Sequence, residues 1–217
     1  MSIFDLVEED IMGLSDEMLA ALLGRLIEAE AAANRIPLGA ITHGGHDNAP
    51  DQGIDARVSW SGAPERTDFF PRRTTVFQSK AETMSRKPLT DEMAPGGRPR
   101  PIFQELAKDD GAYVMFCGRD DCNDRMLRDR KGAMGLAVST VVNAGRLDLD
   151  FYDASRIVRW VNTHTGVAAC CATGSGDRFG AGARMHHGHV PTQAKNSHTL
   201  ATRPSVPPSR LMRKHLR

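Results

Sequence analysis

The chain has 217 residues, of which 40% are hydrophobic, 25% charged and 6% aromatic, and its formal net charge is +1. This composition is typical of a globular protein with an aliphatic core and argues against a disordered chain. No apolar run reaches the roughly 18 residues that a transmembrane helix needs. The acidic start does not resemble a signal peptide, and the four cysteines lack CxxC spacing, so the sequence predicts a cytoplasmic protein with reduced thiols.

An amphipathic helix is the first element that the sequence predicts. Ser15 is a suitable N-cap, and Asp16 and Glu17 follow in the first turn, where the helix dipole favours negative charge. The segment ends before Pro37. Its apolar residues recur at helical spacing and predict one buried stripe: Leu19, Leu22, Leu23, Leu26 and Ile27.

Two strands are predicted next, after a turn-rich stretch. Residues 54–60 alternate between apolar and polar side chains, and Asp55 lies on the polar face. Residues 74–80 are rich in residues that favour strands. Gln78 and Lys80 are two positions apart in this run, so their side chains share one face. The apolar face of the first strand carries Ile54, Ala56, Val58 and Trp60.

The second half of the chain alternates between strands and helices, which predicts an α/β layer structure. Residues 85–101 are expected to be a loop because they contain several prolines and glycines. The elements predicted after this loop are a short helix over 102–108, a buried strand over 112–117, a helix over 121–142, a strand over 147–152 and a helix that Asp153 caps.

The C-terminal segment differs from the rest of the chain in composition and charge. Residues 1–165 hold 20 Lys+Arg and 26 Asp+Glu, whereas residues 166–217 hold 8 and 1. No apolar periodicity is visible after Gly166, so we expect a folded domain over 1–165 and a disordered basic tail over 166–217. The tail has two candidate origins: an ordinary disordered extension, or a frameshift or truncation that replaced the natural continuation.

Asp55, Gln78 and Lys80 are the residues that predict chemistry. If the two strands are neighbours, side chains directly across from each other lie only about 5 Å apart. A carboxylate, an amide oxygen and an ammonium group would then converge. Oxygen ligands suit a hard divalent cation such as Mg²⁺, which can polarise a phosphate and help to generate hydroxide. A neighbouring lysine stabilises the negative charge that develops on the phosphate.

The pattern Gly53-Ile54-Asp55 followed by Val76-Phe77-Gln78-Ser79-Lys80 resembles the PD-(D/E)xK nuclease superfamily, in particular its Mrr-like restriction endonuclease branch. The wider likeness covers about residues 14–164 and is similar to N-terminal nuclease modules of larger bacterial proteins, some of them associated with phage defence. The resemblance implies a restriction-endonuclease-like central mixed sheet flanked by helices. It also implies that Asp55 and Gln78 bind Mg²⁺ or Mn²⁺ and that Lys80 is the catalytic lysine.

Gln78 stands where the superfamily usually has an acidic residue, so a further carboxylate is expected to support the metal. Glu30 falls within roughly 20° of Leu23 around the helix axis, whereas Glu28 falls roughly 140° away from it. A carboxylate on a buried stripe is costly unless it is paired or bound to metal. We therefore predict that Glu30 is the supporting ligand.

The function expected from these residues is metal-dependent endonucleolytic hydrolysis of DNA phosphodiesters. Arg72 and Arg73, and with less support Arg98 and Arg100, are expected to hold the phosphate backbone near the site. RNA remains open as the substrate, a homo-oligomer remains open as the assembly, and no membrane partner is expected. The alternatives are a nuclease fold that binds nucleic acid or protein without cutting, and a truncated remnant.

Overall fold

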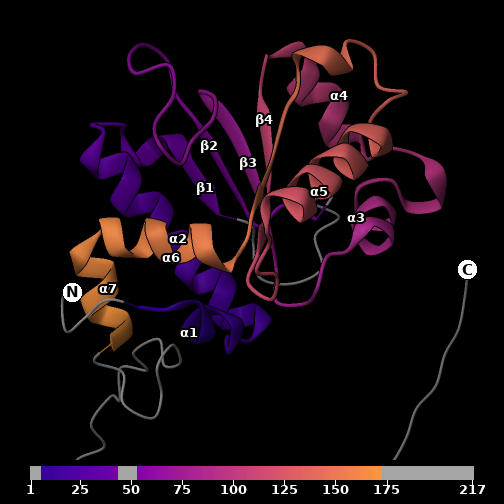
Figure 1. The fold of residues 1–217 in the computed structure, drawn as a ribbon. Coiled ribbons are helices and arrows are strands. Elements are labelled where there is room, and N and C mark those ends of the chain that lie inside the picture. Colours follow the sequence, from indigo (N-terminus) through magenta and orange to yellow (C-terminus); the bar gives the residue numbers. More distant parts are fainter. Residues whose placement is uncertain (1–5, 44–52, 173–217) are drawn as a thin grey trace, which may run out of the picture. The chain divides into compact units, whose positions relative to one another are not determined.

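The fold is a five-stranded mixed sheet with helices on both faces, as the computed structural model shows for residues 6–43 and 53–172 (Figure 1). The first three strands pair antiparallel, and the third, fourth and fifth pair parallel, which confirms the predicted mixed α/β architecture. The strand order in the sheet follows the sequence: β1 (Ile41–His43), β2 (Ala56–Ser59), β3 (Thr74–Lys80), β4 (Ala112–Cys117) and β5 (Asp148–Tyr152).

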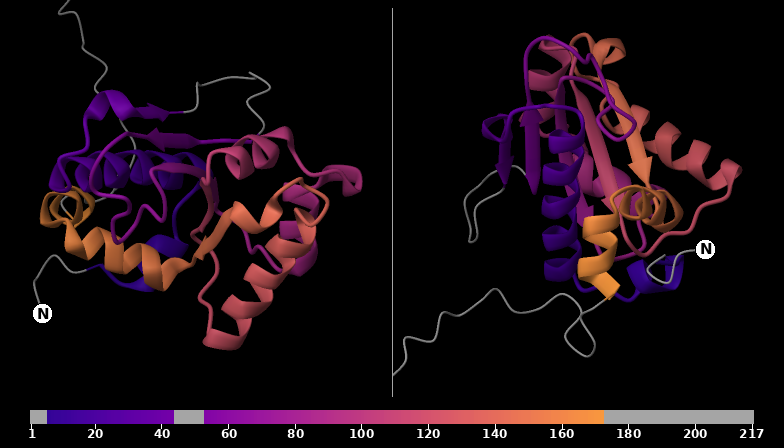
Figure 2. Two further views of the ribbon diagram at one scale, coloured as in Figure 1. Left: turned by 90° about the horizontal axis from the view of Figure 1, so that it is seen from above. Right: turned by 90° about the vertical axis from the view of Figure 1, so that its left-hand side faces the viewer.

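Each face of the sheet is covered by its own set of helices (Figures 1 and 2). One face packs against α1 (Glu8–Met12), α2 (Asp16–Ala33), α6 (Ala154–Thr163) and α7 (Thr165–Ala172). The other packs against α3 (Arg86–Met93), α4 (Pro101–Lys108) and α5 (Asp124–Ala137). These last three helices lie in the crossovers that parallel strands require. Within the described residues, three short 3-10 helices cover Leu38–Ala40, Pro95–Gly97 and Ala144–Arg146.

Two hydrophobic clusters follow from this layering. Phe77 on β3 points into the cluster beside α2 and α6, whereas its neighbour Val76 points into the cluster beside α3, α4 and α5. All six residues of β4 are buried, as the uninterrupted apolar run predicted, because helices cover both faces of a parallel strand. The first cluster centres on Trp160, which stacks on Phe69 with ring centroids 4.8 Å apart.

The helix predicted at the start of the chain is confirmed as α2. The Ser15 side chain accepts a hydrogen bond from the backbone N–H of Met18 at 3.3 Å, which is the expected N-cap contact. The five stripe residues are all buried. Asn34 is the C-cap, and the chain then reverses through Arg35, whose φ of +58° is left-handed.

Four predictions about the elements need correction, and the helix predicted over 121–142 is one of them, because α5 covers only Asp124–Ala137. The segment 85–101 is not all loop, because α3 occupies its first half; Pro88 is tolerated there as the third helical residue, where no intrahelical N–H bond is needed. β2 begins only at Ala56, so Ile54 leaves the expected apolar face and packs on the α3–α5 side. Regular structure also continues past Gly166, since this residue lies inside α7, in which Val167 and Ala168 are buried.

The predicted tail lies mostly outside the described residues, because residues 173–217 are not among them. The domain boundary proposed at residue 165 therefore stays a prediction, except that α7 extends the helical region beyond it. Among the helices of the described residues, none combines the length and apolar character needed to cross a bilayer.

Candidate functional site

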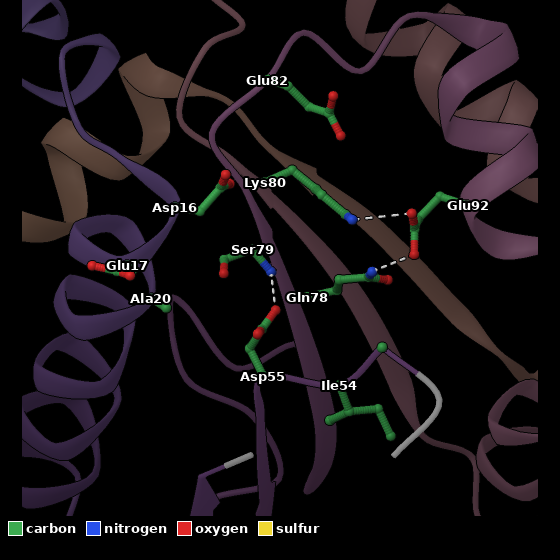
Figure 3. A pocket seen from close by; sticks show the side chains of 11 residues that line it. Asp16, Glu17, Ala20, Ile54, Asp55, Gln78, Ser79, Lys80, Glu82 and Glu92 are labelled. Atoms are coloured by element: carbon green, nitrogen blue, oxygen red, sulfur yellow. Dashed lines mark hydrogen bonds and ion pairs between the residues drawn. The ribbon is translucent and has the colours of Figure 1, made fainter. Parts of the chain in front are cut away.

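A polar hollow lies where β3 ends, between the first turns of α2 and the last turn of α3 (Figure 3). Its volume is about 470 Å³. Residues 53–55, which precede β2, and residues 78–80 at the end of β3 contribute to its lining. The lining residues are Asp16, Glu17, Ala20, Gly53, Ile54, Asp55, Gln78, Ser79, Lys80, Glu82 and Glu92.

The structure brings together three of the predicted site residues, Asp55, Gln78 and Lys80. β2 and β3 are antiparallel neighbours, and Ala56 pairs with Phe77, so the preceding residue Asp55 comes opposite Gln78. The Asp55 carboxylate is held in place by a hydrogen bond of 2.6 Å that it accepts from the backbone N–H of Ser79 (Figure 3). Since residues two apart on a strand share a face, Gln78 and Lys80 both lie on the α3 side of the sheet.

Glu92 is the site residue that the sequence prediction missed. It lies on α3, and its carboxylate is 3.0 Å from Nζ of Lys80 and accepts a hydrogen bond of 2.6 Å from the amide of Gln78 (Figure 3). Arg100 donates to the same carboxylate at 2.6 Å and to the Glu92 backbone carbonyl at 2.6 Å. Leu89 and Met93, four residues apart and both buried, are the periodic signal that could have identified this helix.

Gln78 is almost fully buried, with 3% of its surface exposed, and both ends of its amide are used. The nitrogen donates to Glu92, and the oxygen accepts from the hydroxyl of Tyr113, a core residue on β4. The Tyr113 ring packs edge-on against Phe103, with centroids 4.9 Å apart. Burial raises the pKa of Tyr113 well above its ordinary range, so this hydroxyl keeps its proton and remains a donor.

The charges in the pocket are unbalanced. Of the eleven lining residues in the part of the chain that the structure describes, five are acidic and only Lys80 is basic. Burial alone would raise the pKa of Glu92, but the hydrogen bonds from Gln78 and Lys80 and the charges of Lys80 and Arg100 outweigh it and hold that pKa below its ordinary value. Glu92 is therefore ionised at neutral pH, and the pocket as a whole attracts cations more than it attracts phosphate.

The oxygen donors of the pocket match the requirements of Mg²⁺ or Mn²⁺ in part. No group of three or more His, Cys, Asp or Glu side chains that could hold a metal occurs among the described residues. Mg²⁺ does not need such a cage, because it is commonly held by one or two carboxylates together with waters and substrate phosphates. Asp55 and Glu92 would supply those two carboxylates, whereas the Gln78 oxygen is already engaged by Tyr113.

The buried Asp120 anchors the loop that follows β3. This carboxylate accepts a hydrogen bond from the backbone N–H of Met84 at 3.1 Å and pairs with Arg130 at 3.3 Å. Cys117, at the end of the predicted buried strand, is buried and donates its thiol hydrogen to the Glu82 carbonyl at 3.1 Å. Burial raises the pKa of Cys117 to about 12, so the thiol stays protonated and can act as this donor.

Glu30 does not belong to this pocket, which corrects its assignment as the supporting metal ligand. It is buried, with 3% exposed, as its place on the apolar stripe predicted, but its carboxylate lies 2.9 Å from Nε2 of His164 and also accepts from Asn34. The pocket contains Asp16, at the other end of α2. Fourteen residues at roughly 1.5 Å rise separate the two acidic residues by about 21 Å.

Arg72 and Arg73 are also placed away from the pocket. They precede β3, whereas the pocket lies at the end of this seven-residue strand, about 20 Å away at roughly 3.3 Å per residue. Arg72 pairs with Asp148 at 3.2 Å, and Arg73 pairs with Glu65 at 3.2 Å. Their predicted contact with nucleic acid near the site is therefore not supported by the geometry.

Comparisons with known proteins do not add a family. No protein-family model matches the chain, and neither the curated proteins nor the solved structures contain a match. The resemblance to the PD-(D/E)xK superfamily thus depends on the sequence alone, on the residues around Asp55 and Lys80 and on the wider likeness over about residues 14–164.

Proposed function

We propose that the chain is a metal-dependent endonuclease that hydrolyses DNA phosphodiester bonds. The observation that carries this proposal is the meeting of two carboxylates and one lysine in a single open pocket: Asp55, Glu92 and Lys80. Asp55 directly precedes β2, Lys80 ends β3 and Glu92 lies on α3, so only the folded chain assembles them. Restriction or phage defence, as the biological setting, follows from the sequence resemblance alone.

The two carboxylates would hold Mg²⁺ or Mn²⁺. When bound, such a cation polarises the phosphate and lowers the pKa of a bound water. Asp55 is kept in place by the backbone N–H of Ser79, and Glu92 is kept in place by Gln78 and Arg100. Both carboxylates are therefore oriented before any substrate arrives, which is the condition for electrostatic stabilisation without reorganisation.

Lys80 supplies the positive charge of the chain itself. Its ammonium group is 3.0 Å from the Glu92 carboxylate, and its side chain is only 23% exposed, so the lysine is held within the pocket. A phosphate approaching the acidic rim is repelled by Asp16, Glu17 and Glu82, and the lysine offsets part of this repulsion. We infer that Lys80 stabilises the charge that develops on the phosphate oxygens.

Cleavage of plasmid DNA tests this proposal directly. Purified protein and the variants Lys80→Ala and Asp55→Asn are incubated with supercoiled plasmid in Mg²⁺, in Mn²⁺ and in EDTA, with labelled RNA in parallel. The matched control is Lys87→Ala, which removes a lysine on α3 that is 85% exposed. We expect cleavage by the parent and the control, its loss in EDTA, and a decrease of at least about a hundredfold in Lys80→Ala.

The opposite outcomes are equally clear. Intact nucleic acid in every lane, with protein that unfolds cooperatively, refutes the nuclease. A shift in the mobility of intact DNA would instead identify a binding module with this fold. Cleavage of RNA alone would keep the chemistry and change the substrate.

A further inference from the structure

We propose that Gln78 is a positioning residue that orients Glu92 and does not bind the cation. The inference deepens the proposed function and rests on it in one respect, since it assigns the second metal-binding carboxylate to α3. It also explains why an amide stands at this position of β3. Its basis is the set of groups that surround the Gln78 side chain.

The chemistry of the two neighbours determines which way the amide faces. A carboxylate accepts hydrogen bonds but donates none, so the group that lies 2.6 Å from Oε1 of Glu92 has to be the amide nitrogen. The carbonyl oxygen then faces Tyr113, whose hydroxyl donates to it. The reverse orientation would place two acceptor oxygens, one of them charged, against each other.

The surroundings leave the amide little freedom. A Cβ added to Gly53 would lie 3.0 Å from the amide nitrogen and 3.1 Å from Nη1 of Arg100, so the Gly53 backbone packs closely against both groups. Tyr113 closes the opposite side and is fully buried. The Gln78 carbonyl is therefore directed into the core, and the nitrogen is directed toward the pocket.

A carboxylate at position 78 could not take this role. Two ionised carboxylates at hydrogen-bond distance repel each other, and one of them would take up a proton. Glutamine supplies an N–H donor to Glu92 and accepts the Tyr113 hydrogen bond with the same side chain. The uncharged residue on β3 and the acidic residue on α3 thus form one arrangement, in which the helix carries the negative charge and the strand supplies a neutral donor.

Cation binding by the Tyr113→Phe variant distinguishes a Gln78 that positions Glu92 from a Gln78 that is itself a metal ligand. This variant removes a hydroxyl that is buried beneath the amide and leaves the ring in place. If Gln78 positions Glu92, binding of Mg²⁺ or Mn²⁺, measured by calorimetry, weakens by on the order of tenfold, as for other residues that orient metal ligands. If Gln78 is itself a ligand, the variant frees its carbonyl, and equal or tighter binding overturns the proposal.

The matched control is Tyr152→Phe. The Tyr152 hydroxyl is also buried, but it donates to the Phe69 carbonyl at 3.1 Å and lies in the other hydrophobic cluster. Cation affinity in this variant should equal that of the parent. An equal loss in both variants would attribute the effect to general loosening of the fold and would contradict the proposal.

A second measurement tests the hydrogen-bonded chain without any cation. The side-chain amide resonances of Gln78, assigned with Gln78→Met in ¹⁵N-labelled protein, should move in Tyr113→Phe and in Glu92→Gln and stay unchanged in Tyr152→Phe. Resonances that do not respond to Glu92→Gln refute the positioning role. This readout needs no activity. A protein that neither binds cations nor cuts nucleic acid would therefore refute the nuclease proposal, whereas the resonances would still show whether Gln78 is hydrogen-bonded to Glu92 and Tyr113.

Discussion

Replacing Glu92 with glutamine removes one negative charge from the centre of the pocket and keeps the volume of the side chain. In the parent, this carboxylate is shared by Gln78, Lys80 and Arg100. In the variant, Lys80 and Arg100 face a neutral amide. Its single oxygen can accept hydrogen bonds from only some of the three former donors. The free energy of unfolding should therefore fall.

The size of the loss follows from the contacts and their exposure. A hydrogen bond to a charged group contributes about 1.5–3 kcal/mol. The three contacts do not simply add, because the side chains of Glu92, Lys80 and Arg100 are 19%, 23% and 24% exposed and the cations can regain water. We expect a total loss of about 2 kcal/mol, which corresponds to a decrease in Tm of about 4–8 °C for a domain of this size.

The loss should also depend on pH. The folded state holds the pKa of Glu92 below its ordinary value, so the carboxylate contributes stability above its unfolded-state pKa, and this contribution disappears as the pH falls through the folded-state pKa. The protonated side chain then resembles glutamine. The difference between parent and variant should be full at neutral pH and should shrink below the ordinary glutamate pKa of about 4.3.

Urea unfolding at pH 7, 5 and 4, followed by circular dichroism, measures both effects. Asp91→Asn is the matched control on the same helix, because Asp91 is 62% exposed and, within the described part of the chain, its ion pair is with Lys87, one turn earlier. Such an exposed pair contributes at most about 0.5 kcal/mol. A Glu92→Gln loss no larger than that of the control, or one that stays constant with pH, would refute the reasoning.

Three further predictions concern the surroundings of the pocket. Gly53→Ala should lower the unfolding free energy by about 1–2 kcal/mol and abolish plasmid cleavage, because φ is +75° and a Cβ would press on Gln78. Glu30→Gln should lower it by about 1–3 kcal/mol yet leave the cleavage rate of the folded protein unchanged. The double variant Arg72→Ala with Arg73→Ala should bind DNA in a mobility-shift assay as tightly as the parent does. Weaker binding would show that these arginines contact the DNA after all.

Local structure was predictable wherever a short-range rule decides it. β3 covers the predicted residues 74–80, and Asp153 caps α6 through the backbone N–H of Arg156 at 3.0 Å. Alternation and capping act over a few residues, so the sequence contains them completely. The rule failed where signals conflict: the prolines of segment 85–101 concealed α3, although Pro88 lies in the first turn, where proline is tolerated.

By itself, the sequence determined that Gln78 and Lys80 share one face, and it predicted that Asp55 joins them if the two strands are neighbours, as the structure shows they are. It also determined that Glu30 is buried, because periodicity gives the angle of a residue around a helix axis. Only the tertiary structure decided how far along that axis the pocket lies.

The same limit applies to Glu92. Its distance from Lys80 depends on how α3 packs against the sheet, and no spacing in the sequence specifies this packing. The direction of the Gln78 amide depends in turn on Tyr113 from β4 and on Glu92 from α3, which meet only in the folded chain. Hydrogen-bond direction and the distance between separate elements arise from packing, whereas the face on which a residue lies follows from the chain alone.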